Sequence, residues 1–157
     1  MKIKALIFII VFIVLLTGIA AAKPVITADQ TYFDINTGLY VLKGNVFIQV
    51  NNRTITAGQA KVDMASLEVW GSGGISVTQD DIHFTGDSVY VCGANSQASI
   101  DGGVEFARTN LSIKANKVDF NWRSRIANFC GDVEVTQGNN RWKAANVVYN
   151  VDTDTFL

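Results

Sequence analysis

The sequence predicts an all-β protein built from repeated pairs of antiparallel strands. An aromatic or branched apolar residue returns every 29 positions, at Ile26, Ile55, Phe84, Ile113 and Trp142. Within each interval, small or apolar residues alternate with polar ones, which is typical of a strand with one buried face. The links between these segments are short, and after residue 22 no stretch has the period of a helix. Because short links join antiparallel strands, parallel strands are not expected.

The fixed period indicates stacked copies of one structural unit. Glycine keeps the same spacing, at Gly44, Gly73, Gly102 and Gly131. In such a stack each unit contacts only its neighbours, so the molecule is elongated. We therefore expect a long sheet rather than a compact domain around one pocket.

Each copy contains two strands, and both are expected to bend. In the strand over residues 26–33, the alternation changes phase near Asp29 and Gln30. A phase change indicates a bulge or bend, because the second half would otherwise face solvent. The strand over residues 40–48 carries Gly44 near its middle, where glycine permits a kink. Bent strands would fold the sheet into two layers, and the apolar interior would be either a solid core or a slot for an apolar ligand.

Polar residues repeat at the positions of the turns. One turn contains Asn51-Asn52, Asp80-Asp81, Thr109-Asn110 and Gly138-Asn139, and the other begins at Asp34, Asp63, Cys92, Asn121 and Asn150. These residue types favour tight turns. The aspartates at such positions are therefore interpreted as turn residues and not as a catalytic pair.

The sequence offers no pattern of catalytic or metal-binding residues. His83 is the single histidine, and its counterparts in the other copies are Thr54, Ser112 and Arg141. No cysteine–histidine cluster has the spacing of a metal site, and no nucleophile elbow or phosphate-binding loop occurs. We expect a protein that is not an enzyme and that uses no metal and no cofactor. A polysaccharide-acting enzyme built on repeated strands is the catalytic alternative.

Residues 1–22 have the form of a secretory signal peptide. Lys2 and Lys4 precede the apolar run 5–16, and the segment ends in small residues at 20–22. This pattern predicts export and cleavage before Lys23. The alternative is an uncleaved anchor, because 18 uncharged residues reach the short limit for crossing a bilayer.

Residues 23–157 suit a single domain in length. Their net charge is about −3 and no basic face emerges, so nucleic acid is not an expected partner. Cys92 and Cys130 would lie three strands apart in a simple meander, beyond the reach of a disulfide. Only a sheet folded over onto itself could join them, and two free thiols are the alternative.

The two ends of the repeat array look unfinished. The fifth copy begins at Trp142 but contains no second strand with its glycine, and the strand over residues 26–33 has no earlier copy beside it. Repeat proteins normally carry polar caps. Two open edges would allow head-to-tail stacking of copies; the alternative is a monomer with edges protected by charge and twist.

The segments Lys23–Asp29 and Leu42–Gln49, followed by Ile55–Val62, resemble the opening of the OstA-like family of periplasmic lipopolysaccharide-transport bridge proteins. The resemblance covers nearly all of residues 23–157. It implies a twisted antiparallel β-jellyroll, folded over and open at both ends. It also implies a periplasmic location and an apolar slot that shields the acyl chains of lipid A. The expected partners are lipopolysaccharide, the inner- and outer-membrane components of the transport machine, and further copies of the chain, head to tail.

The candidate lipid-binding residues are those expected on the inner face: Ile26, Leu42, Val46, Ile48, Ile55, Ile75, Val77, Phe84, Val104, Phe106, Ile113, Val133 and Val135. Two other functions remain open. One is the inner-membrane-anchored partner of the same machine, which shares the fold. The other is a structural or adhesive surface repeat with a solid core.

Overall fold

The structure is a computed structural model that describes residues 25–157 except residue 51. The expected signal peptide, residues 1–22, lies outside the described residues. The described strands are β1 (Val25–Thr27), β2 (Gln30–Asp34), β3 (Leu39–Val50), β4 (Arg53–Asp63), β5 (Glu68–Gln79), β6 (Ile82–Cys92), β7 (Gln97–Arg108), β8 (Leu111–Asn121), β9 (Ile126–Gln137), β10 (Asn140–Asn150) and β11 (Thr155–Phe156). In this part of the chain the fold is all-β, as the sequence predicts.

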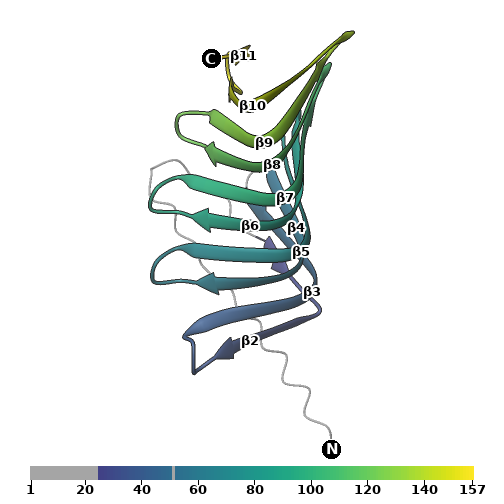
Figure 1. The fold of residues 1–157 in the computed structure, drawn as a ribbon. Coiled ribbons are helices and arrows are strands. Elements are labelled where there is room, and N and C mark those ends of the chain that lie inside the picture. Colours follow the sequence, from purple (N-terminus) through teal and green to yellow (C-terminus); the bar gives the residue numbers. More distant parts are fainter. Residues whose placement is uncertain (1–24, 51) are drawn as a thin grey trace, which may run out of the picture.

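The strands form one antiparallel sheet whose order follows the chain from β3 to β11. At the start of the sheet, β1 and β2 pair with two successive parts of β3, so they act as one interrupted edge strand. The sheet does not close, because β1 and β2 lie at one end of the stack and β10 and β11 at the other (Figure 1). This arrangement confirms the folded-over antiparallel jellyroll that is open at both ends.

Every long strand bends near its middle, where the pairing register shifts. Between β5 and β6, for example, the shift lies between Ser72 and Ile75. At each of these bends on the odd-numbered strands β3 to β9, two successive residues have positive φ: Gly44-Asn45, Gly73-Gly74, Gly102-Gly103 and Gly131-Asp132. The sequence predicts the bend and its glycine. It does not reveal that the following residue is also left-handed.

The bends divide the sheet into two arms that meet at an angle (Figure 1). The first arm ends in the two-residue turns that join β5 to β6, β7 to β8 and β9 to β10, and β3 and β4 adjoin at the same end. The second arm ends in the four-residue turns that join β2 to β3, β4 to β5, β6 to β7, β8 to β9 and β10 to β11. We call the open side between the turns of the two arms the mouth.

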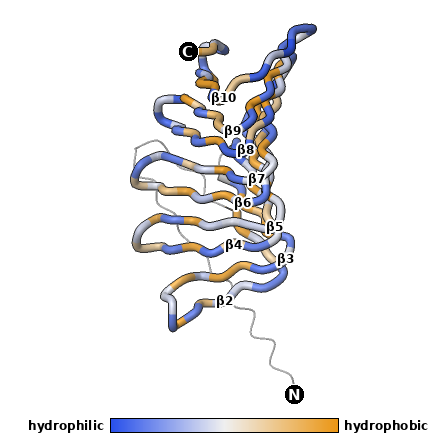
Figure 2. The backbone as a smooth tube through the Cα atoms, viewed as in Figure 1, coloured by the Kyte–Doolittle hydropathy of each residue, from blue (hydrophilic) through white to orange (hydrophobic). Residues whose placement is uncertain are grey.

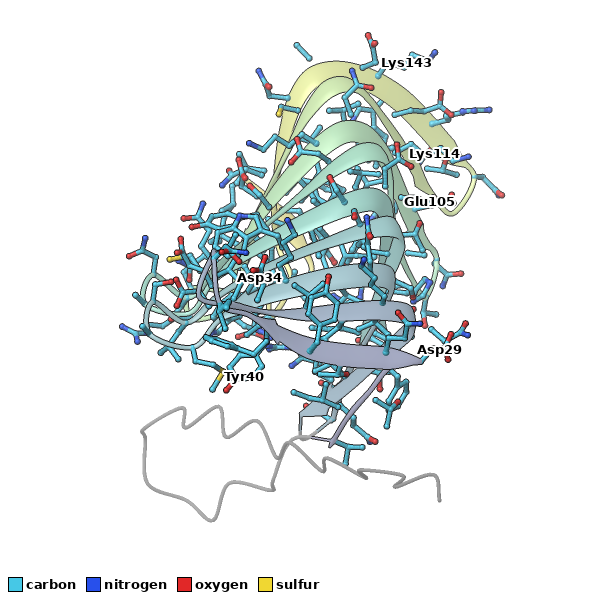
Figure 3. The ribbon with its side chains drawn as sticks, turned by 90° about the horizontal axis from the view of Figure 1, so that it is seen from below. Asp29, Asp34, Tyr40, Glu105, Lys114 and Lys143 are labelled. Atoms are coloured by element: carbon cyan, nitrogen blue, oxygen red, sulfur yellow. The ribbon has the colours of Figure 1, made fainter. Side chains whose placement is uncertain are left out.

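Apolar side chains from both arms face each other inside the angle. Hydrophobic segments recur on successive strands along the stack (Figure 2). The outer faces carry charged pairs such as Glu105 and Lys114, which are opposite each other on β7 and β8 and are exposed (Figure 3). The alternation of inner apolar and outer polar residues is what positions the candidate site between the arms.

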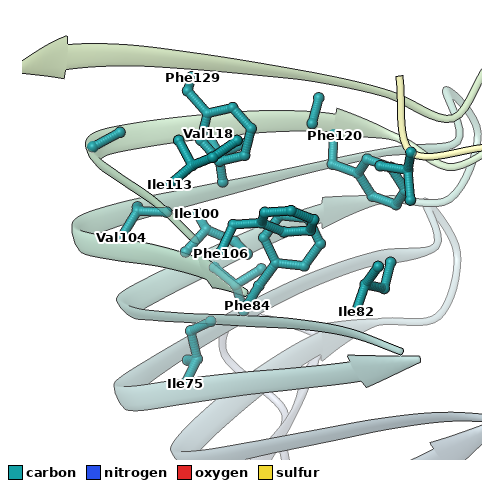
Figure 4. Close-up of a cluster of buried hydrophobic side chains, with 14 of the residues drawn as sticks. Ile75, Ile82, Phe84, Ile100, Val104, Phe106, Ile113, Val118, Phe120 and Phe129 are labelled. Atoms are coloured by element: carbon teal, nitrogen blue, oxygen red, sulfur yellow. The ribbon is translucent and has the colours of Figure 1, made fainter. Parts of the chain in front are cut away.

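The C-terminal half of the interior is tightly packed. The ring of Phe106 lies 4.8 Å from that of Phe84, 5.8 Å from that of Phe129 and 5.6 Å from that of Tyr149, measured between centroids. Phe106 is fully buried (Figure 4). Offset and tilted aromatic pairs of this kind add to the stabilisation from burial. This half of the interior is therefore a solid core.

The turns of the second arm use their polar first residue as expected. The carboxylate of Asp63 accepts hydrogen bonds from the backbone N–H groups of Ala65 (2.8 Å) and Ser66 (3.2 Å). These bonds lower the pKa of Asp63, that from Ser66 most strongly. Cys92 and Cys130 are both free thiols, so folding the sheet over does not join them.

Candidate functional site

Two adjoining apolar cavities lie between the arms, where strands β3 to β6 of the first arm face strands β4 to β8 of the second. Their volumes are about 120 Å³ and about 60 Å³. They share five lining residues, namely Arg53, Ile55, Val89, Val91 and Trp122. The interior is therefore solid in one half and incompletely filled in the other.

Both arms contribute to the walls of these cavities. Ile55 from β4 and Val77 from β5 are opposite each other on the first arm, and both are only half-buried. Val89 and Val91 from β6 project from the second arm. Because most of the wall residues are apolar, the cavities suit hydrocarbon rather than water.

The basic residue at these cavities is Arg53, at the start of β4. The repeat places Ile82 and Leu111 at the corresponding positions, and these side chains are 3% and 4% exposed. The Arg53 guanidinium donates hydrogen bonds to Oε1 of Gln79 from Nε (3.0 Å) and from Nη2 (2.9 Å). Burial, and to a lesser extent the charge of Arg125, lowers its pKa.

Trp122 faces Arg53 from the second arm. The Arg53 Cζ atom lies 5.7 Å from the centroid of the Trp122 ring, within the range of a cation–π interaction. Arg53 follows the turn between β3 and β4, whereas Trp122 lies in the turn between β8 and β9. The pair therefore spans the mouth at the cavities.

A second arginine spans the mouth in the solid half. Arg108 donates from Nη1 to the hydroxyl oxygen of Tyr149 (2.9 Å) and to the backbone carbonyl of Val151 (2.8 Å). Its Nη2 also forms an ion pair with Asp81 at 2.8 Å. Arg108 therefore joins the two arms with every edge of its guanidinium engaged.

The structure separates the candidate lipid-binding residues into three groups. Ile48, Ile55, Val77 and Phe84 line the cavities. Ile26 is partly buried on the edge strand β1. The remaining eight are buried members of the core: Leu42, Val46, Ile75, Val104, Phe106, Ile113, Val133 and Val135. The candidate list thus mixes cavity walls with solid core.

Sequence reasoning missed most of the second arm and the charged residue at the mouth. The missed cavity residues are Arg53, Val62, Asp63, Met64, Leu67, Val69, Gln79, Ile82, Val89, Val91, Gly93, Ala98, Ile100, Phe120 and Trp122. A signal for several of them exists, because Phe33, Val62, Val91, Phe120 and Tyr149 are also 29 positions apart. For Arg53, the signal is a basic residue at a position where two other copies have an aliphatic one.

The two ends of the stack expose apolar side chains. Of the seven large exposed apolar residues among those described, all but Trp70 lie on or beside the terminal strands. These six are Val25, Tyr32, Phe33, Ile35, Trp142 and Leu157. In addition, the outer edge of β10 forms backbone contacts within the described chain only near its end, over residues 148–150. The ends combine apolar surface with unpaired strand edge.

The polar residues near the turns show ordinary local contacts. His83 lies opposite Thr78, and its Nδ1 is 2.8 Å from the Thr78 hydroxyl. Across residues 25–50 and 52–157, no three His, Cys, Asp or Glu side chains are grouped so that they could hold a metal ion. Over the same residues, the structure contains no helix that could span a membrane.

The fold and site define an open, bent β-sheet protein with an apolar interior. The model of a family described as LptA/(LptD N-terminal domain) LPS transport protein matches residues 25–155. The chain therefore belongs to this family of lipopolysaccharide transport proteins, which confirms the resemblance drawn from its sequence. The comparison with curated proteins gives no match.

Among solved structures, the chain is similar to LptH from Pseudomonas aeruginosa, described as the LptA homologous periplasmic component of the conserved lipopolysaccharide transport device. The TM-score is 0.62 at 14% sequence identity, and the match covers 69% of this chain and 82% of that one. At this identity the match supports the fold alone.

Proposed function

We propose that this chain is a periplasmic lipopolysaccharide-binding transport protein that shields lipid A acyl chains between its two arms and carries out no catalysis. The observation that carries the proposal is the pair of apolar cavities in a member of a lipopolysaccharide transport family. Hydrocarbon moved from water to an apolar site gains about 0.8 kcal/mol per methylene. A lipid with several chains therefore needs such a site to cross an aqueous compartment.

The size of the cavities sets how lipid enters. An apolar cavity of about 150 Å³ is known to stay dry and to bind benzene. The two cavities here, of about 120 and 60 Å³, match a short stretch of one chain. Longer or additional chains require the arms to move apart.

The construction of the sheet allows this movement. Strand pairing runs along the sheet, so the arms are joined by backbone only through the bends. At the cavities, the contact across the mouth between Arg53 and Trp122 uses side chains. Rotation about the bends would widen the angle without breaking a strand pair, and the sugars of the lipid would remain in water at the mouth.

The ends of the stack support assembly with other proteins of the same fold. The terminal strands present apolar side chains and an unpaired edge, and such edges pair readily with another strand. End-to-end pairing would place successive interiors in line. A head-to-tail array with membrane components at its two ends would then bridge the inner and outer membranes. The signal-like residues 1–22 fit export to the periplasm.

Photo-crosslinking tests the lipid route. A photoreactive amino acid at Ile55, which lines both cavities, is expected to form adducts with lipopolysaccharide in cells. The same amino acid at Thr56, the exposed neighbour on β4, is the matched control and is expected to form none. Equal labelling at both positions, or none at Ile55, would refute the proposal.

A further inference from the structure

Arg53 places a charge on the apolar inner face of the first arm. It occupies the position where the next two copies bury Ile82 and Leu111. Moving a charged group out of water is costly unless it is paired. The ion pairs among the described residues involve other side chains, and none joins a carboxylate to Arg53 within 4.0 Å. Arg53 therefore places a cation at an apolar cavity without an ion-pair partner among the described residues.

The orientation of the guanidinium leaves one edge available. Nε and Nη2 both donate to the same oxygen of Gln79, and Nη1 has no hydrogen-bond acceptor among the described residues. The two terminal nitrogens of a guanidinium can bind two oxygens of a phosphate or carboxylate at once. A ligand at the mouth could use this edge while Gln79 and Trp122 hold the group in place.

Arg108 shows what a purely structural arginine looks like in the same fold. It also lies at the mouth, but it engages Asp81, Tyr149 and the carbonyl of Val151, beside a solid interior. Arg53 lacks the carboxylate and lines both cavities. The arginine with a carboxylate partner thus lies beside the packed interior, and the arginine without one lies beside the unfilled interior.

The surrounding charges favour an anion. Asp63 also lines the larger cavity, but its carboxylate is held by the backbone N–H groups of Ala65 and Ser66. Arg125, whose charge acts on Arg53, forms its ion pair with Asp152 at 2.8 Å. The free edge at the cavity mouth is thus cationic.

We propose that Arg53 binds the anionic head group, a phosphate in lipid A, of an amphiphile whose acyl chain enters the adjoining cavities. The assignment rests on the proposed function and adds to it the residue that recognises the charge of the cargo. Apolar walls alone would accept any alkyl chain, whereas a guanidinium at the mouth selects chains that carry an oxyanion. It would also fix how deeply the chain enters.

The test compares lipid A with the same lipid stripped of its phosphates, in equilibrium binding to the full chain. The wild-type protein is expected to bind the phosphorylated form at least about tenfold more tightly, as for a hydrogen-bonded charged group. Arg53→Leu restores the aliphatic residue of the neighbouring copies and is expected to fold, to bind both forms, and to lose the preference. Arg53→Lys is expected to keep part of the preference, because lysine retains the positive charge but lacks the two parallel donors of the guanidinium.

Arg123→Gln removes an exposed positive charge from the turn that contains Trp122, and it is the matched control. It is expected to keep the full preference. Binding of both lipids without preference by the wild-type protein, or a preference that survives in Arg53→Leu, would overturn the assignment and leave the proposed function intact. Absence of binding to either lipid would overturn both. If inorganic phosphate competes with lipid A at the same concentration as the lipid, Arg53 belongs to a site for free anions. The assignment to a lipid head group would then be wrong.

Discussion

The backbone of Gly102 on β7 packs directly against the side chain of Asp87 on β6. A Cβ atom on Gly102 would lie 2.8 Å from the Asp87 Cβ, closer than real Cβ contacts allow. Gly102 also has φ +81°. Its neighbour Gly103 has φ +52°, and a Cβ there would meet no atom within 4 Å. The two glycines of the bend therefore face different constraints.

Alanine substitutions distinguish these constraints. Gly103→Ala is expected to cost about 1 kcal/mol of unfolding free energy, from left-handed strain alone. Gly102→Ala is expected to cost about 3 kcal/mol, because the strands must also shift to admit the new methyl group. Urea denaturation measures both values. Equal losses would show that the close approach to Asp87 does not constrain the bend.

Arg108→Met is expected to lower the stability of the protein, because Arg108 joins the two arms beside the solid part of the interior. The substitution preserves much of the aliphatic stem but removes the hydrogen bonds to Tyr149 and Val151 and the ion pair with Asp81. Loss of charged hydrogen bonds at a mostly buried site predicts a decrease of about 2 kcal/mol in the free energy of unfolding.

Arg123→Met is the control for this substitution, because Arg123 is exposed. It is expected to change stability by less than about 0.5 kcal/mol. The two variants are compared by urea denaturation at one pH. A loss shared equally by both would show that the bonds across the mouth contribute nothing specific.

The stability of the protein is expected to fall at alkaline pH. Burial, followed by the hydrogen bond to Asp154, raises the pKa of Tyr149 to about 12 from its ordinary value of 10.0. In the unfolded chain this hydroxyl ionises first, so the unfolded state binds fewer protons above pH 10. The stabilisation is therefore complete below pH 10 and is lost as the pH rises towards 12.

Thermal unfolding across this pH range checks the effect. Tyr149→Phe should show a shallower decline than the wild type, whatever its starting stability. A residual decline is expected, because the hydrogen bond to Glu68 also raises the pKa of Tyr90 to about 12. Parallel pH curves for the variant and the wild type would contradict the role of Tyr149.

Association between copies is expected to depend on the terminal strands. Trp142 on β10 is 37% exposed and packs edge-on against Phe156 with ring centroids 5.3 Å apart. Trp142→Asp would place a charge on this end and is expected to weaken self-association at least about tenfold. Trp70→Asp is the control, because Trp70 is 38% exposed but lies on β5, which is paired on both sides by β4 and β6. Analytical ultracentrifugation over a concentration series compares them, and equal effects would contradict assembly through the ends.

Most of the fold can be predicted from the sequence because its repeat is unusually regular. The phase change near Asp29 corresponds to the break between β1 and β2, and Gly44 lies at the observed bend of β3. Alternation and turn residues are local properties, so they are visible in a single chain. The position of each strand follows from them.

The candidate site is predicted less completely because it depends on contacts between arms. Val77 and Phe106 have the same alternation, yet Val77 borders a cavity and Phe106 is fully buried in the core. The difference arises from which side chains face them across the angle, such as Phe129 and Tyr149 for Phe106. Strand periodicity does not contain this information.

The ladder order of the sheet has a consequence for chain length. Each strand from β4 to β9 is paired only with the strand before it and the strand after it. Duplicating one 29-residue unit in the middle would therefore lengthen the sheet by two strands and leave the other strand pairings unchanged. The length of the sheet therefore depends on the number of units in one polypeptide. A chain with more or fewer units could fit a wider or narrower space between two membranes.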